Sequence, residues 1–195
     1  MDNPNKIEQF KLKDGRVVQL KRITKEDYEN EESYIFVHNW LHQINKYLAL
    51  EFKESNLERN KKGFMQMLSN TESLFVVGAI FEEKIIAQSS LELNTMSKKH
   101  KHIGTWGIAI HPNFQNQGLG IKLLKELERI AEKKGIKKLE TSFYEGNNSA
   151  KRLYVEKLGY KIEGRQKFGV RLKDGTYTDK VLIGKILDES IISNK

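Results

Sequence analysis

A helical pattern of apolar residues lies between two short β-like runs in the second half of the chain. The apolar positions follow the spacing i, i+1, i+4, i+7 and i+8, at Leu123, Leu124, Leu127, Ile130 and Ala131. This spacing is typical of an amphipathic helix, and Gly135 is placed to end it. The flanking runs 103–110 and 138–144 have the length of buried strands. We therefore expect a β–α–β unit over 103–144, with a loop at the carboxyl end of its first strand.

The first half of the chain contains runs that predict two β-hairpins. The segment 10–23 is expected to form a strand pair around the turn Lys13-Asp14-Gly15-Arg16. The runs 73–81 and 84–93 are expected to form a second pair, joined by Glu82-Glu83. Because these two runs are mostly apolar, the second hairpin should belong to a largely buried sheet.

Two helices are expected between these hairpins. Thr24 and Asp27 resemble a capping box, so one helix is predicted over 26–50, and another follows over 55–68. Acidic residues near the start of the first helix could attract a cationic amine, although charge at a helix start is more often solvated and matched to the helix dipole. These residues are Glu26, Asp27, Glu29, Glu31 and Glu32.

Candidate chemistry begins with the loop Gln115-Asn116-Gln117-Gly118-Leu119-Gly120, which we name the cradle loop (115–120). Gly118 and Gly120 carry no side chain and permit a tight turn, so successive backbone N–H groups can point inward at an anion. The helix that begins near Leu119 adds unpaired N–H donors and the positive end of its dipole. The loop is therefore a candidate pyrophosphate site, and an ordinary strand-to-helix turn is the alternative.

Two common phosphate-binding motifs do not match the cradle loop. A Rossmann G-x-G-x-x-G would need its third glycine where Leu123 stands. A P-loop would end in Gly-Lys-Ser or Gly-Lys-Thr, whereas Gly120 is followed by Ile121 and Lys122. What remains is the pattern Q-x-x-G-x-G.

A second informative stretch covers 147–160. Asn147 can cap a short amphipathic helix there, and Gly159 can close it. The apolar face of this helix contains Ala150, Leu153, Tyr154 and Leu158. Taken alone, Tyr154 would be interpreted as a core aromatic residue.

The two stretches together resemble the GNAT superfamily of N-acetyltransferases. The Q-x-x-G-x-G pattern is similar to the acetyl-CoA signature of that family, and N-x-x-A-x-x-L-Y followed by Leu-Gly-Tyr is similar to its second signature. The second motif begins 27 residues past Gly120, in the helix–strand–helix order of the family. The resemblance extends from about Val17 to the last apolar run, 181–187, and points to a bacterial-type subgroup that acts on amino acids, small amines or protein N-termini.

The resemblance implies an α/β (α+β) fold, with a mixed, mostly antiparallel central sheet, helices on both faces, and the strands 103–111 and 138–144 splayed apart. It implies acetyl-CoA as co-substrate, with the pantetheine arm lying in the gap like an added strand. The implied acetyl-CoA-binding residues are Ile108, Ala109, Ile110, Gln115, Asn116, Gln117, Gly118, Leu119, Gly120, Ile121, Asn147, Ala150 and Tyr154.

The implied reaction is direct attack of a neutral primary amine on the acetyl thioester in a ternary complex. A backbone N–H of the splayed strand would stabilise the oxyanion, and Tyr154 matches the family position that protonates the departing thiolate. Glu92 and Glu140 are weak candidates for a general base, because only their place on neighbouring strands suggests them. The acceptor, a small amine or peptide amine, would be selected by 24–69 and 165–180. A non-catalytic acyl-CoA-binding or sensing module is the alternative function.

Composition limits these interpretations. A chain of 195 residues with 38% hydrophobic content and no linker-like segment predicts one domain, 1–195, with its core at about 17–187. The absence of cysteine excludes disulfides, thiolate zinc sites and cysteine nucleophiles. His38 and His42 are spaced i, i+4 but lack the Glu of H-E-x-x-H, so we expect no metal.

A net charge of +8 could indicate a polyanionic partner or simply a solvated surface. The densest cluster, 98–102, lacks the interleaved aromatic residues of a nucleic-acid module, so we expect a solvated hairpin tip and no nucleic-acid partner. Residues 1–10 lack an apolar signal region, and no apolar run is long enough to span a bilayer. Both features favour a cytoplasmic protein without a membrane partner. The oligomeric state cannot be read, and a homodimer is left open.

Overall fold

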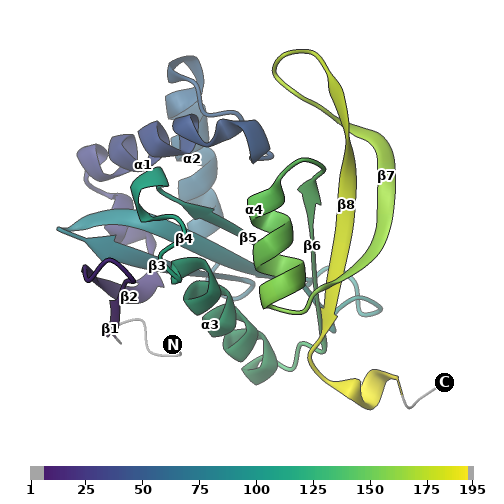
Figure 1. Cartoon of the computed structure of the whole chain (residues 1–195). Helices are drawn as coiled ribbons and strands as arrows, with labels where there is room; N and C mark the ends of the chain where they lie inside the picture. The colour runs from purple at the N-terminus through teal and green to yellow at the C-terminus, as the bar shows by residue number, and fades with distance from the viewer. Residues whose placement is uncertain (1–6, 193–195) are drawn as a thin grey trace.

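The computed structural model describes residues 7–192 and is built on one eight-stranded sheet (Figure 1). The strand order is β1-β2-β3-β4-β5-β6-β8-β7. The strands are β1 (Glu8–Lys11), β2 (Val17–Ile23), β3 (Leu74–Phe81), β4 (Lys84–Leu93), β5 (Ile103–Ile110), β6 (Lys138–Tyr144), β7 (Lys161–Arg171) and β8 (Tyr177–Ile186). Within the described range every neighbouring pair is antiparallel except β5–β6. The predicted mixed, mostly antiparallel sheet is confirmed.

Both predicted hairpins are present. The β1–β2 turn is closed by the Leu12 N–H, which donates to Arg16 O at 2.8 Å. In the β3–β4 turn Glu82 and Glu83 both have positive φ, 48° and 61°, the backbone that a two-residue type I′ turn requires. Such turns match the right-handed twist of the strands they join, which explains why two glutamates accept this conformation here.

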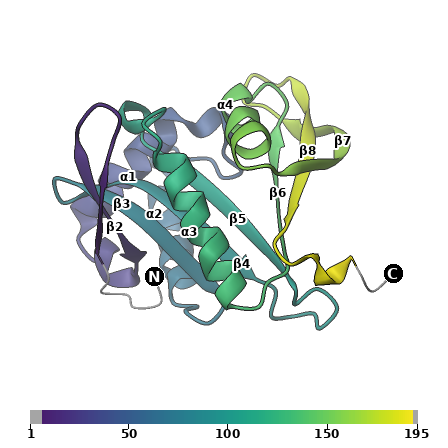
Figure 2. The same ribbon diagram turned by 60° about the horizontal axis from the view of Figure 1, so that its bottom comes forward.

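Helices cover both faces of the sheet (Figure 2). They are α1 (Glu31–Gln43), α2 (Leu57–Leu68), α3 (Leu119–Lys133) and α4 (Asn148–Lys151). Side chains of β3 alternate between two cores: Phe75 and Val77 pack with α3, whereas Leu74 and Val76 pack with α1 and α2. This two-sided burial explains the nearly continuous apolar run of β3.

The predicted helix over 26–50 is wrong at both ends. Thr24 N–H does donate to Asp27 Oδ2 at 2.9 Å, but the capped element is a short 3₁₀ turn, η1 (Lys25–Tyr28), that buries Tyr28. The helix α1 begins later, where Asn30 Oδ1 accepts from Glu32 N–H at 3.0 Å.

The chain leaves the helix after Gln43 and passes through the 3₁₀ turn η2 (Asn45–Tyr47). There the Tyr47 hydroxyl donates to Gly146 O at 3.2 Å, so this segment spans from α1 to the end of β6 instead of continuing as a helix.

The predicted α-helix of the second motif is also corrected. Only its first turn, α4, is α-helical, and the remainder is a π-helical turn, η5 (Arg152–Lys157). Leu158 N–H accordingly donates to Leu153 O, five residues back, at 3.1 Å. The expected apolar face survives, because Ala150 and Leu158 are buried.

The strands β5 and β6 separate soon after they begin. Their parallel pairing joins Ile103 to Lys138, Gly104 to Leu139 and Thr105 to Glu140, and it stops there. The predicted splayed pair is therefore present, with α3 leading from the end of β5 back to the start of β6.

No helix within residues 7–192 is long and apolar enough to cross a membrane. The expectation that 1–10 lack a signal region includes 1–6, which lie outside the described residues. The basic cluster 98–102 forms the turn between β4 and β5, as predicted.

Candidate active site

A cleft of about 1470 Å³ lies along the line where β5 and β6 separate. Residues of both strands, of the cradle loop and of 147–157 line it, together with residues of α1, of α2 and of the segment between them. Sites for one small molecule usually have volumes of about 300–1,000 Å³. This cleft is therefore large enough for two substrates side by side.

The cradle loop enters the cleft at the start of α3. Asn116 and Gly118 both have left-handed backbone, with φ of 61° and 87°. The first amide bonded back into the helix is Lys122 N–H, which donates to Gly118 O at 3.2 Å. The N–H groups of the three preceding helical residues have no carbonyl partner within the helix. Together with the helix dipole, these groups make the start of α3 a positive end, as an anion site would require.

Most of the expected acetyl-CoA-binding residues meet at this cleft. Those that line it are Ile108, Ala109, Ile110, Gln115, Asn116, Gly118, Gly120, Ile121, Asn147, Ala150 and Tyr154. Two do not. Leu119 is buried in the core with 1% of its surface exposed, and the Gln117 side chain turns away to accept from Asp14 N–H at 3.1 Å. Only the backbone of these two residues remains for a ligand.

Gly120 is required by packing as well as by any ligand. A Cβ there would lie 2.9 Å from Leu153 Cδ2 and 3.4 Å from Ile110 Cδ1. A side chain at this position would therefore displace the Leu153 methyl groups that pack between α3 and η5. From the sequence, both glycines were expected to give a tight turn and an open backbone for a ligand, and packing against Leu153 is a further role of Gly120.

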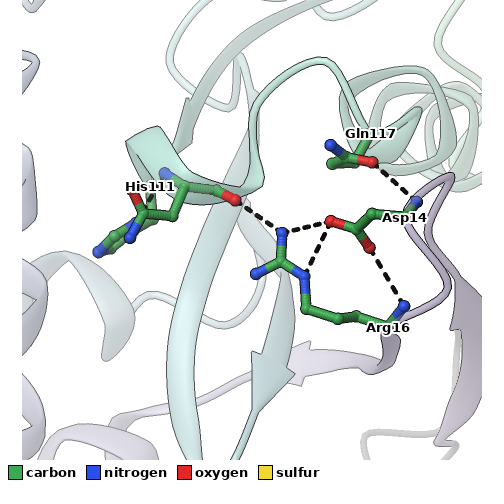
Figure 3. Close-up of polar contacts among 5 residues, drawn as sticks. Asp14, Arg16, His111 and Gln117 are labelled. Carbon is green, nitrogen blue, oxygen red and sulfur yellow. Dashed lines mark hydrogen bonds and ion pairs between the residues drawn. The ribbon is translucent and has the colours of Figure 1, made fainter.

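The β1–β2 turn braces the cradle loop from outside (Figure 3). Arg16 donates to Asn113 O at 2.7 Å and to Asp14 Oδ2 at 2.6 Å, while its guanidinium lies 4.0 Å from the centre of the Phe114 ring. The hydrogen bond from Arg16 holds the pKa of Asp14 below its usual value. Sequence reasoning missed this brace, because its partners are about a hundred positions apart and share no local pattern.

The edge of β5 that faces the gap offers backbone groups at Ile108. Neighbouring residues of the same edge already have side-chain donors: Thr141 Oγ1 donates to Trp106 O at 2.8 Å, and Gln115 Nε2 donates to Ile110 O at 3.0 Å. Backbone direction alternates along a strand, so Ile108 points its N–H and C=O to this edge as well. Ala109 lies between them and pairs with Gln88 of β4.

Tyr154 stands between the two splayed strands. Its ring packs edge-on against Trp106 of β5, with centroids 4.8 Å apart, and against Phe143 of β6 at 6.3 Å. The hydroxyl makes no hydrogen bond to any residue in the described range, and Tyr154 is one of the residues that line the cleft. Burial raises the pKa of Tyr154 above the ordinary phenol value, so the group is protonated at neutral pH. Its ring belongs to the core, and its hydroxyl is free to act.

No Asp or Glu of residues 7–192 lines the cleft. Glu140 lies in the paired part of β6, 3.6 Å from Lys138 Nζ, and Glu92 lines a different pocket. Neither weak candidate for a general base is therefore in place. No group of three possible metal ligands occurs among the described residues either.

The two segments expected to select the acceptor behave differently. Within 24–69, α1, α2 and their connection supply many residues of the cleft, whereas none of its lining residues comes from 165–180. Sequence reasoning named no single residue for this part of the site, because its members lie on several elements that meet only after folding.

The fold combines a mixed sheet, one splayed pair of parallel strands and a cleft along the split. The sequence model of the Acetyltransferase (GNAT) family matches residues 21–160. The chain belongs to this family and is an N-acetyltransferase that uses acetyl-CoA, as the two motifs predicted.

Solved structures share this fold at low sequence identity. An acetyltransferase of the GNAT family from Streptococcus pneumoniae is 22% identical, with a TM-score of 0.69 over 87% of this chain and 98% of that one. A ribosomal-protein-S5-alanine acetyltransferase from Vibrio fischeri is 16% identical, with a TM-score of 0.71 over 93% of this chain and 98% of that one. The putative acetyltransferase yncA of Salmonella typhimurium, whose structure contains its cofactor acetyl-CoA, is 20% identical. Its TM-score is 0.66 over 88% of this chain and 95% of that one. No curated protein matches the chain.

Proposed function

We propose that the cleft binds acetyl-CoA and a primary amine together and transfers the acetyl group directly between them. The observation that carries the proposal is the meeting of three features on one cleft: the free N–H groups at the start of α3, the free edge of β5 and the Tyr154 hydroxyl. Residues 1–195 would serve this reaction as one domain, with its core at about 17–187.

Each feature suits one part of acetyl-CoA. The cradle loop and the first turn of α3 would hold the pyrophosphate through backbone N–H groups. Ile108 would hydrogen-bond the pantetheine arm as a neighbouring strand would, and the side chain of Asn147 lies on the opposite wall. The Tyr154 hydroxyl would then lie near the sulfur.

The chemistry follows from these positions. The amine nitrogen attacks the thioester carbonyl carbon, and a backbone N–H of the β5 edge stabilises the oxyanion. When the C–S bond breaks, Tyr154 donates its proton to the sulfur and regains one that the amine has released. Because no Asp or Glu of residues 7–192 lines the cleft, water relays this one proton from the amine nitrogen to the phenolate oxygen of Tyr154.

A thiol-release assay tests this function directly. Acetyl-CoA is offered with amino acids, polyamines, aminoglycosides and peptides with free N-termini, and acetyl-CoA binding is measured separately by calorimetry. Release of CoA with stoichiometric acetyl-amine product supports the proposal. Binding without turnover of any amine would favour the non-catalytic sensing module, and absence of binding would contradict both.

A further inference from the structure

The charged side chains that line the cleft are all cationic. They are Lys13, Lys46, Arg59, Arg152 and Lys157, and no acidic residue of 7–192 accompanies them. The phosphates of CoA account for some of this charge. Lys13 lies in the turn that braces the cradle loop, so it is on the phosphate side.

Two of the cations, Lys46 and Arg59, belong to η2 and α2, which are elements other than the cradle loop and the helix that follows it. Lys46 has an acidic neighbour, since its charge helps to lower the pKa of Asp174, and its Nζ lies 5.3 Å from the centre of the Tyr47 ring. Arg59 makes no hydrogen bond or ion pair with any residue that the structure describes. The charge of Arg59 helps to lower the pKa of Glu51, but the Glu51 carboxylate forms its ion pair with Lys53, at 2.8 Å. Arg59 therefore has an uncommitted guanidinium beside the cleft.

Apart from Lys46 and Arg59, the lining from α1, α2 and the segment between them is uncharged and mostly apolar, and its polar members include Gln43 and Asn60. Its apolar side chains include Tyr34, Val37, Leu41, Phe52, Phe64 and Met67. A second ammonium group on the acceptor would lose hydration against this lining and find no carboxylate to replace it. A carboxylate, in contrast, could form a charge-assisted, bidentate pair with Arg59.

We propose that the acceptor is a primary amine that also carries a carboxylate and an apolar body, the chemistry of apolar amino acids, and that Arg59 binds the carboxylate. This inference rests on the proposed acetyltransfer and names its acceptor class. It argues against polyamines and aminoglycosides, and it gives the acidic residues 26–32 no part in acceptor binding, because none of them lines the cleft.

The test compares an acceptor that carries a carboxylate with one that lacks it and with a polyamine. Phenylalanine, phenylalaninamide and spermidine are assayed by thiol release at saturating acetyl-CoA. Phenylalanine should have a kcat/KM about 10- to 100-fold above that of its amide, the range of a charge-assisted hydrogen bond. Spermidine should be the poorest acceptor.

Two variants assign the effect to Arg59. R59Q should raise KM for phenylalanine by about the same factor and leave KM for the amide and the acetyl-CoA Kd unchanged, while R59K should restore part of the preference. Lys62→Gln, an exposed cation of α2 outside the cleft, is the matched control and should change nothing.

The outcomes separate the two proposals. Equal use of the amide, preference for spermidine, or an unchanged phenylalanine KM in R59Q would overturn the acceptor class while acetyltransfer stands. Acetyl-CoA binding without turnover of any amine would overturn both the acceptor class and the enzymatic role, and loss of acetyl-CoA binding in the wild type would refute the cleft as the site itself.

Discussion

Gly120 and Leu153 pack so closely that a Cβ on Gly120 would lie 2.9 Å from Cδ2 of Leu153. One residue belongs to the first turn of α3, and the other precedes Tyr154 in η5. This contact joins the anion-binding end of the cleft to the turn that carries the phenol. The two family motifs therefore pack directly against each other at the cleft.

The contact predicts a cost for the smallest added side chain. Gly120→Ala should lower the free energy of unfolding by about 1–3 kcal/mol, the usual penalty for overpacking. Gly63→Ala is the control, since a Cβ at this position in α2 meets nothing within 4 Å and alanine should stabilise by about 0.5–1 kcal/mol. Urea unfolding measures both. If Leu153→Ala does not relieve the Gly120→Ala defect in the double variant, the close contact is not its cause.

Asn116 tests whether the pyrophosphate lies at the cradle loop. Asp has the shape of Asn and also tolerates left-handed backbone, so Asn116→Asp adds a negative charge with little other change. Repulsion at contact distance should raise the acetyl-CoA Kd about tenfold or more at low salt, and less at high salt. Asn113→Asp adds the same charge outside the cleft and is the control. Equal affinities of both variants and the wild type in calorimetry would remove the pyrophosphate from this loop.

Local sequence patterns predicted the elements whose formation depends on neighbouring residues. The period of Leu123, Leu127 and Ile130 marks α3, and the alternating burial of β3 explains a run that periodicity alone leaves ambiguous. Thr24 and Asp27 led to the wrong prediction of a helix that starts at 26, and the reason is physical. The motif can cap any helical turn, and here the burial of Tyr28, whose hydroxyl donates to Gln88 Oε1 at 2.7 Å, selects a 3₁₀ turn.

Contacts between distant segments could not be predicted in this way. Nothing local in Asp14 or Gln117 indicates that they meet, and nothing near Arg59 indicates that the opposite walls of its cleft lack acids. The motifs drew attention to the cradle loop and to Tyr154 because, in the family that they resemble, these positions serve a shared cofactor. The cleft residues of η2 and α2, which we propose bind the acceptor, follow no shared motif. Their common position became visible only in the folded chain.

Arg16 should matter for acetyl-CoA more than for the acceptor. Arg16→Ala removes the donor to Asn113 O and the cation above the Phe114 ring, so the segment that leads into the cradle loop loses its outer support. We expect KM for acetyl-CoA to rise several-fold, with kcat and the acceptor KM little changed. Steady-state kinetics with each substrate varied in turn measure this split, and Lys11→Ala in the same hairpin serves as control. If Arg16→Ala lowers only the free energy of unfolding and leaves KM for acetyl-CoA unchanged, the contacts of Arg16 contribute to stability and not to cofactor binding.

Buried His38 makes stability depend on pH. Its side chain is 2% exposed, and desolvation lowers its pKa in the folded protein. The unfolded chain has the ordinary value of about 6.5, so below that pH it binds more protons than the folded state does. The free energy of unfolding should therefore reach its highest value above about pH 6.5 and decrease as the pH drops below it. His38→Gln should flatten this fall in urea titrations, although His111, whose pKa burial also lowers, leaves a remainder. A slope identical to that of the wild type would exclude His38 as its source.

Removing the Tyr154 hydroxyl distinguishes a catalytic phenol from a packed aromatic residue. The ring contacts with Trp106 and Phe143 are kept by phenylalanine, and the hydroxyl has no partner among the described residues that would be lost. Tyr154→Phe should therefore unfold at nearly the same urea concentration as the wild type, with an acetyl-CoA Kd within a few-fold.

The rate should respond quite differently. If the hydroxyl protonates the departing thiolate, Tyr154→Phe should lower kcat by about 10²–10⁴-fold, the usual span for a general acid. Because burial raises its pKa, the phenol stays protonated through the working range, and the wild-type kcat should show no loss from its ionisation up to about pH 10. Tyr144→Phe, which alters another tyrosine of the same cleft, is the matched control and should retain most of the rate. Turnover of Tyr154→Phe at the wild-type rate would return Tyr154 to the core, and an equal loss in both variants would point to a general disturbance of the cleft.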